Sequence, residues 1–413
     1  MSDRPHAIAS PSKAAMWLVC ANSLAANEGQ PEGDRKAADL GTDKHELMTM
    51  CLEFGVDAMT YEGHVLGKGH TVNRELANDV QTVVDNVRER IHGYELRGAS
   101  VELVLDQAVP IGHITGEENA TGTLDVALIV TWPAGHTSLD VIDAKFGYQE
   151  VTAEWNPQLL MYASGALEEQ GLVYDFIEVN LVIEQPLRGT TEWATTPDAI
   201  AQWVEDAVPR AEKALMIRRM VGERALKEED FTVSEKGCMW CKAKAVCPAL
   251  RAKVEDTFMS ISDCDDPSGG NAETMAAFLE VEELGPTFAT LELIEDWIKA
   301  VRARVELELL AGKPIPGLKL VAGKKGNRAW ASDEEAEAMM KKFKMKQDQM
   351  YSFKVLGPKP ILDALKDQPR RLKQIEQLVV QSNGKPHVAL ESDKRPALEI
   401  KPVEDGFDVE ELC

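Results

Sequence analysis

Three apolar, strand-like stretches follow one another in the middle of the chain, at 101–105, 122–130 and 139–145. Apolar residues alternate or run continuously in each stretch, and glycine and proline lie in the connections, as is typical of neighbouring strands. Helical spacing of apolar residues flanks them, and a fourth strand pattern follows; these segments are 40–54, 73–93, 157–169 and 176–183. The order helix, three strands, helix, strand predicts an α/β sheet and excludes a helical bundle.

The overall composition limits the kinds of protein that this chain can be. A length of 413 residues exceeds a single core and predicts two domains. No stretch approaches the roughly 18 consecutive apolar residues of a membrane span, and no secretory signal is evident, so we expect a cytoplasmic protein without a membrane partner. The formal net charge of -24 excludes a protein that coats nucleic acid through bulk positive charge. Any DNA-binding site must therefore be a local groove.

Two aspartates interrupt strongly apolar strands and so need an explanation. Asp125 follows Leu124, and Asp143 lies in the run Asp143-Ala144-Lys145. A buried carboxylate without a cation or partner is costly, and two carboxylates can bind Mg²⁺ or Mn²⁺, which activates water at a scissile phosphate. Lys145 would orient that water or stabilise the developing anion. Taken alone, an Asp followed two residues later by Lys is common and often has no catalytic role.

Three cysteines form the run C-x2-C-x5-C, at Cys238, Cys241 and Cys247, and Cys20 stands far ahead of them. A reducing compartment disfavours a disulfide framework, so the spacing of the cysteines matters more than their number. Thiolates of this kind hold iron-sulfur clusters, whereas a tetrahedral zinc site or buried thiols are the alternatives.

Four motifs occur in an informative order: G-T-x-x-H at 41–45, G-T-x-D at 122–125, D-A-K at 143–145 and N-P-Q-L-x-x-Y at 156–162. This order resembles the RecB-like branch of the PD-(D/E)xK nucleases, with a restriction-endonuclease-like core. More closely, the chain is similar to a phage and prophage nuclease family catalogued only as a domain of unknown function. Segments 10–20, 319–321 and 391–396 match that family as well, so the resemblance covers nearly the whole chain.

The resemblance implies a role for each motif residue. Metal ligation is implied for His45, Asp125, Asp143 and the Ala144 carbonyl, assistance to the attacking water for Lys145, and positioning of the DNA strand for Gln158 and Tyr162. A histidine ligand favours Mn²⁺ more than an all-oxygen site does. By itself, His45 would more often be a structural helix residue than a ligand, and Gln158 and Tyr162 could equally be structural. Glu102 matches an acidic strand position of relatives without an assigned role, and Phe146 stands where relatives often have tyrosine.

The cysteines are similar to those of AddB-type helicase-nuclease subunits and of the iron-sulfur nucleases of CRISPR adaptation. These proteins place one cysteine before the nuclease core and three after it, as Cys20, Cys238, Cys241 and Cys247 are placed. The resemblance implies a [4Fe-4S] cluster that joins the two ends of the nuclease domain. Cys51, Cys264 and Cys413 are expected to be ordinary core or surface thiols.

The predicted function is a metal-dependent DNA exonuclease that acts from DNA ends in phage recombination or replication, in the cytoplasm of a bacterial host if the protein is phage-encoded. The alternatives are a non-catalytic DNA-binding or assembly subunit that retains the nuclease fold, and an acidic zinc-bearing adaptor. The expected domains are a nuclease domain at 1–262, a mainly helical domain at 263–380 and a polar tail at 381–413. Basic residues of the second domain are further candidates for DNA contact: Lys324, Lys325, Arg328, Lys341, Lys342 and Lys344.

Overall fold

The structure is a computed structural model that describes residues 7–31, 35–220, 226–262 and 281–319, together with a few isolated positions beyond them. The chain divides into two compact units, Met1–Leu318 and Lys319–Cys413. Within the described ranges, none of the helices combines the length and apolar character that crossing a membrane requires. The first unit contains all the named strands and helices considered below.

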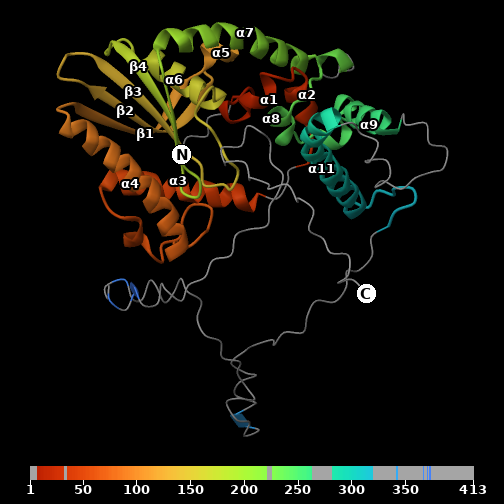
Figure 1. The fold of residues 1–413 in the computed structure, drawn as a ribbon, viewed down its shortest axis with the longest axis horizontal. Coiled ribbons are helices and arrows are strands. Elements are labelled where there is room, and N and C mark those ends of the chain that lie inside the picture. Colours follow the sequence, from red (N-terminus) through yellow and green to blue (C-terminus); the bar gives the residue numbers. More distant parts are fainter. Residues whose placement is uncertain are drawn as a thin grey trace, which may run out of the picture. The chain divides into compact units, whose positions relative to one another are not determined.

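A five-stranded mixed sheet forms the centre of the first unit (Figure 1). Its strands are β1 (Ser100–Pro110), β2 (Thr121–Thr131), β3 (Thr137–Ala144), β4 (Phe176–Gln185) and β5 (Gly189–Thr195), in the order 1-2-3-4-5. All neighbours pair antiparallel except β3 and β4, which are parallel. A parallel pair needs a crossover, and helix α6 (Pro157–Gln170) provides it.

Helices cover both faces of the sheet, as Figure 1 shows. Helices α3 (Lys36–Phe54) and α4 (Arg74–Leu96) bury one face together with alternate β2 residues such as Val126 and Leu128. Helices α6 and α7 (Pro197–Arg219) bury the other face with the intervening residues Ala127 and Ile129. Successive strand side chains point to opposite faces, so a strand covered on both sides is apolar throughout.

Several short helices and the longer α9 lie in the segments before, between and after the strands. These are η1 (Pro11–Lys13), α1 (Ala14–Trp17), α2 (Ser23–Asn27), η2 (Ala58–Tyr61), α5 (Gly112–Thr115), η3 (Glu228–Asp230), α8 (Glu235–Met239), η4 (Lys244–Val246) and α9 (Pro248–Ser262). Trp17 is buried with Ala207 and Ala211 of α7, and α1 also contacts α8. The beginning of the chain therefore lies against the segment that carries the later cysteines.

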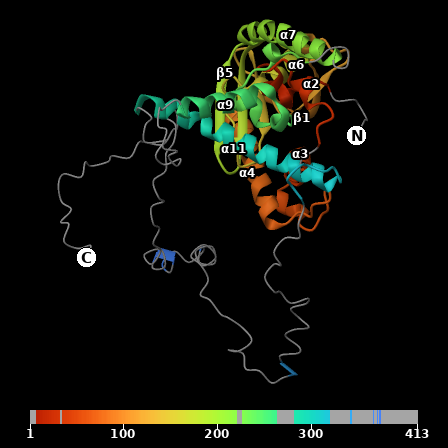
Figure 2. The ribbon, with the colours of Figure 1, turned by 90° about the vertical axis from the view of Figure 1, so that its right-hand side faces the viewer.

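Helix α11 (Val281–Leu310) belongs to the first unit. It contacts α8, α9 and η4, and Figure 2 shows it close to α9. The compact unit thus ends at Leu318, whereas the sequence placed the end of the nuclease domain at 262. The reason is that α11 packs back on the region that follows the sheet, a contact that periodicity does not reveal.

The predicted α/β class is confirmed as a mixed sheet flanked by helices. Two local differences appear: α3 begins at Lys36 and not at 40, and β5 was not predicted. Most of the predicted helical domain at 263–380 and the whole predicted tail at 381–413 lie outside the described residues, as do Lys324, Lys325, Arg328 and Lys344. Lys341 and Lys342 are described as helical and exposed.

Candidate functional site

A half-buried acid, Asp125, and a buried acid, Asp143, meet where the ladder between β2 and β3 ends. The last paired residues are Val126 and Ile142. Beyond them the Ala144 amide donates to Oδ2 of Asp125 at 2.9 Å, so a side chain replaces the backbone acceptor of the neighbouring strand. Asp143, one residue before Ala144, is 3% exposed. The structure therefore brings the two predicted carboxylates to one end of adjacent strands.

His45 of α3 completes one side of this site. Its Nδ1 lies 3.2 Å from Oδ1 of Asp125, and its ring packs edge-on against Phe146 at a centroid distance of 5.2 Å. Phe146 also lies below Lys44, whose Nζ is 5.5 Å from the ring centroid. The phenyl ring thus fixes the orientation of the imidazole by packing, although it offers no hydroxyl.

Lys145, Gln158 and Tyr162 form the other side of the site. Nζ of Lys145 lies 2.6 Å from Oδ2 of Asp143 and donates to Oε1 of Gln158 at 3.1 Å. The Gln158 amide donates to Oδ1 of Asp143 at 3.2 Å and to the Tyr162 hydroxyl at 3.0 Å. The Asn156 side chain caps α6 by accepting a hydrogen bond from the backbone N–H of Gln158, and this holds the first turn in place. Gln158 is therefore the bridge between the helix and the acids.

The charges of the site are mutually dependent. Burial would lower the pKa of His45, but the Asp125 carboxylate outweighs burial and raises it. Burial likewise would raise the pKa of Asp125, yet His45 and the Ala144 amide lower it. Burial raises the pKa of Asp143, and the neighbouring Asp125 carboxylate acts in the same direction against Lys145. When two carboxylates lie close together, one keeps its proton more readily and the other stays ionised. An added positive charge therefore stabilises such a site.

A third acid faces the same site and was missed in the sequence. Asp106 of β1 interrupts the ladder between β1 and β2 at the point opposite Asp125, and its φ is +47°, in the left-handed region. Burial raises the pKa of Asp106, and the Asp125 carboxylate adds to the increase. Glu102, which the resemblance singled out on the same strand, instead accepts a hydrogen bond from Tyr174 at 2.7 Å. An acid within an apolar strand was the sequence signal that could have identified Asp106. Because β1 contains two such acids, Glu102 and Asp106, this signal alone did not show which of them faces the site.

The donor set fits a hard divalent cation such as Mg²⁺ or Mn²⁺. Two buried atoms, His45 Nδ1 and Asp143 Oδ2, are paired with charged neighbours, Asp125 at 3.2 Å and Lys145 at 2.6 Å. Over the same part of the chain, no three His, Cys, Asp or Glu side chains are arranged as a formed metal site. Each carboxylate is turned toward a protein cation, and a metal ion would compete with those cations.

The four predicted cysteines influence one another electrostatically, although among the described residues no three of them are arranged to hold a metal ion. Cys20 follows α1, Cys238 lies in α8, and Cys241 and Cys247 follow α8. Burial raises the pKa of the Cys20, Cys238 and Cys247 thiols, and the neighbouring cysteines of the group raise it further. The described cysteines, which include the buried Cys51, are all free thiols. Ligation of a metal by these thiols would require their deprotonation.

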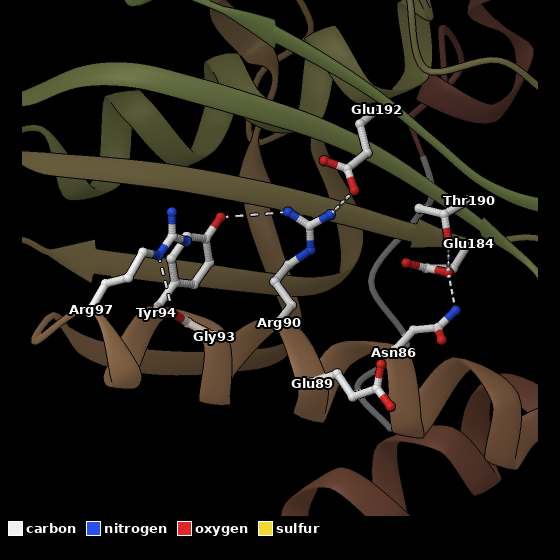
Figure 3. A pocket seen from close by; sticks show the side chains of 9 residues that line it. All are labelled: Asn86, Glu89, Arg90, Gly93, Tyr94, Arg97, Glu184, Thr190 and Glu192. Atoms are coloured by element: carbon white, nitrogen blue, oxygen red, sulfur yellow. Dashed lines mark hydrogen bonds and ion pairs between the residues drawn. The ribbon is translucent and has the colours of Figure 1, made fainter.

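A separate polar cleft of about 380 Å³ lies between α4 and the hairpin of β4 and β5 (Figure 3). Three of its charged groups, Arg90, Glu184 and Glu192, have polar partners across the cleft. Arg90 contacts Glu192 and the fully buried Asp140, and Glu184 accepts from Asn86 and Thr190 at 2.8 Å each. These pairs link α4 to the sheet and give this part of the cleft a structural explanation.

Comparison with known protein families places this site in a family context. A family model described as "Protein of unknown function (DUF2800)" matches residues 6–396. The matched range includes every residue of the carboxylate site and all four grouped cysteines. The site is therefore carried by the part of the chain that the family shares.

Proposed function

The chain belongs to the DUF2800 family, and from this starting point we propose that it is a metal-dependent DNA exonuclease of the PD-(D/E)xK type. One observation carries the proposal. One connected network joins residues from four separate segments. These are His45 in α3, Asp125 in β2, Asp143 and Lys145 at the end of β3, and Gln158 in α6. Acids and a lysine in contact at strand ends suit hydrolysis of a phosphodiester.

The roles of the residues follow from their contacts. His45, Asp125 and Asp143 would hold Mg²⁺ or Mn²⁺, with the Ala144 carbonyl as the further ligand that the resemblance implies. When bound, the metal ion supplies Lewis-acid activation of water and neutralises charge on the phosphate. Lys145, now paired with Asp143, would be released toward the attacking water or the developing anion. Gln158 and Tyr162 would hold the DNA strand against these groups.

The grouped cysteines support a second part of the proposal, a structural [4Fe-4S] cluster bound by Cys20, Cys238, Cys241 and Cys247. The loop that it closes spans the whole sheet, since β1 to β5 lie between Cys20 and Cys238. Ligation of this kind adds to the free energy of folding. The cluster has no step in hydrolysis, and Zn²⁺ is the alternative ion for the same thiolates.

A time course of DNA digestion tests the proposed activity. End-labelled linear DNA, circular DNA and single strands are incubated with Mg²⁺ or Mn²⁺, and products are resolved by length. The proposal expects metal-dependent shortening of linear DNA from its ends, with circles resistant. Asp143→Asn should abolish it, while Glu102→Gln, a matched change of a carboxylate that contacts Tyr174 on the same sheet, should not. Binding of DNA without cleavage in wild type would instead identify a non-catalytic subunit.

A further inference from the structure

Two aromatic side chains stand exposed in the loop that joins β3 to α6, here called the aromatic loop (residues 146–156). Tyr148 is 79% exposed and Trp155 is 58% exposed. The loop begins directly after Lys145 and ends two residues before Gln158. Two large aromatic rings are thus exposed on one short segment whose two ends lead directly to residues of the candidate site.

Hydrogen bonds fix the aromatic loop to the hairpin of β4 and β5. Side chains of the hairpin make five hydrogen bonds with backbone groups of the loop. They run from Arg188 Nε to Tyr148 O at 3.0 Å, from Gln185 Nε2 to Gln149 O at 2.8 Å, from Val151 N to Gln185 Oε1 at 2.8 Å, from Ala153 N to Thr191 Oγ1 at 3.1 Å and from Thr191 Oγ1 to Val151 O at 3.4 Å. The first of these contacts also places the exposed Arg188 next to Tyr148. The exposed rings are therefore held on a rigid support with a cation at one end.

Trp155 has an unfavourable backbone conformation. Its φ is +52°, which is uncommon for a bulky residue, and its ring lies 4.6 Å from that of Trp193 on β5. Strain of this kind tends to be kept where a residue has a use. The contact with Trp193 leaves more than half of the Trp155 side chain exposed, so one indole supports the other without covering it.

We propose that the aromatic loop is a stacking platform for the unpaired bases of single-stranded DNA. Stacking on this platform would direct the DNA strand toward Lys145 and Gln158. The inference rests on the proposed nuclease function and names its substrate as a single-stranded end. Base stacking on aromatic rings is tolerant of sequence, because every base has a π-face. It also suits this chain, whose net charge of -24 disfavours binding through the phosphate backbone. Arg188 offers a local contact for one phosphate.

Substitutions at Trp155 can separate stacking from folding. Trp155→Gly removes the ring and at the same time relieves the backbone strain, since glycine accepts a positive φ. Trp155→Phe keeps a ring and should retain most of the affinity. Tyr148→Ala removes the most exposed ring of the loop and has little packing to lose. The matched control is Phe54→Ala, another exposed aromatic, which ends α3 nine residues and roughly 13 Å beyond His45.

Fluorescence anisotropy with labelled oligo(dT) of about 20 nucleotides, in Ca²⁺ to suppress cleavage, measures the affinity. Trp155→Gly should weaken binding by about 5-fold to 150-fold, the range for loss of one stacked base, and Tyr148→Ala should weaken it in the same direction. Phe54→Ala should bind as wild type does. Because stacking carries no charge, the factor for Trp155→Gly should be equal at about 50 mM and 200 mM salt. Affinity for blunt duplex should not change.

The outcomes separate the platform from the nuclease activity. If Trp155→Gly and Tyr148→Ala both bind oligo(dT) as tightly as wild type, the platform is overturned, even when wild type digests DNA. A wild type that binds duplex and oligo(dT) equally, with no effect of Trp155, overturns it as well. If wild type cleaves nothing with any metal, but the Trp155-dependent binding persists, the platform stands and the nuclease proposal fails.

Discussion

Gly122→Ala is expected to damage both the stability of the protein and the order of the site. A Cβ at this position in β2 would lie 2.8 Å from Cε1 of Tyr162 and 2.9 Å from Cγ of Pro11. Ordinary contact begins at 3.4 Å, so the Tyr162 ring must move by about 0.6 Å or the strand must shift. Both neighbours are buried ring atoms with little freedom to yield.

The size of the effect follows from two opposing contributions. Overpacking of a core costs roughly 1–3 kcal/mol. Alanine in place of glycine also reduces the freedom of the unfolded chain, which stabilises by about 0.4–1 kcal/mol. The net expectation is a decrease of about 1–2 kcal/mol in the free energy of unfolding. Displacement of Tyr162 should also disturb its 3.0 Å hydrogen bond with Gln158 and lower cleavage by roughly tenfold to 100-fold.

Urea unfolding of wild type and Gly122→Ala under the same conditions measures the loss as a lower midpoint at unchanged slope. Gly93→Ala is the matched control, because a Cβ there meets nothing within 4 Å and the residue lies inside α4. Helix propensity predicts that Gly93→Ala is neutral or stabilising. A Gly122→Ala protein within about 0.5 kcal/mol of wild type would show that the close approach of Tyr162 does not constrain this strand.

Three further outcomes are expected. Lys145→Ala should lower cleavage at least about 100-fold while calorimetry shows Mn²⁺ binding retained, and wild-type turnover would remove Lys145 from the mechanism. Mn²⁺ affinity should rise with pH through and above the ordinary histidine pKa of about 6.5. The reason is that the pKa values of His45 and Asp143 are both raised, and each group must lose its proton to bind metal. Calorimetry that finds a pH-independent Mn²⁺ affinity from about pH 5 to 8 would contradict this. Anaerobically purified protein should be brown and contain iron. Cys20→Ser should remove the colour, whereas Cys51→Ser should not. A colourless protein with stoichiometric zinc would refute the cluster and leave the nuclease proposal untouched.

The acidity of the chain and the proposed substrate are compatible if recognition is local. Asp125 and Asp143 contribute to the net charge, yet a bound divalent cation would reverse the sign of the field at the scissile phosphate. Stacking on Tyr148 and Trp155 needs no positive surface. A protein with these properties should bind DNA weakly at random internal positions and more strongly where bases are unpaired and a metal site is near.

Local patterns in the sequence were sufficient to predict the α/β class and most of its elements. The period of apolar residues is a local property, so 122–130 and 157–169 could be assigned as strand and helix, which the structure contains as β2 and α6. The acids were recognisable for the same reason, since Asp125 and Asp143 interrupt apolar strands. Strand β5 could not be recognised because it is half exposed and polar, with Thr191 and Glu192 in place of a buried apolar run.

Tertiary structure decided which of these residues meet. The place of Asp106 opposite Asp125 depends on the pairing of β1 with β2, and the bridge made by Gln158 depends on how α6 packs on the sheet. The support of Trp155 by Trp193 joins a loop to a strand that follows it by almost 40 residues. Register and packing are set by contacts between distant segments, whereas periodicity reports only neighbours in sequence. The sequence by itself thus determined the elements and the kinds of donor, and the fold alone determined their geometry.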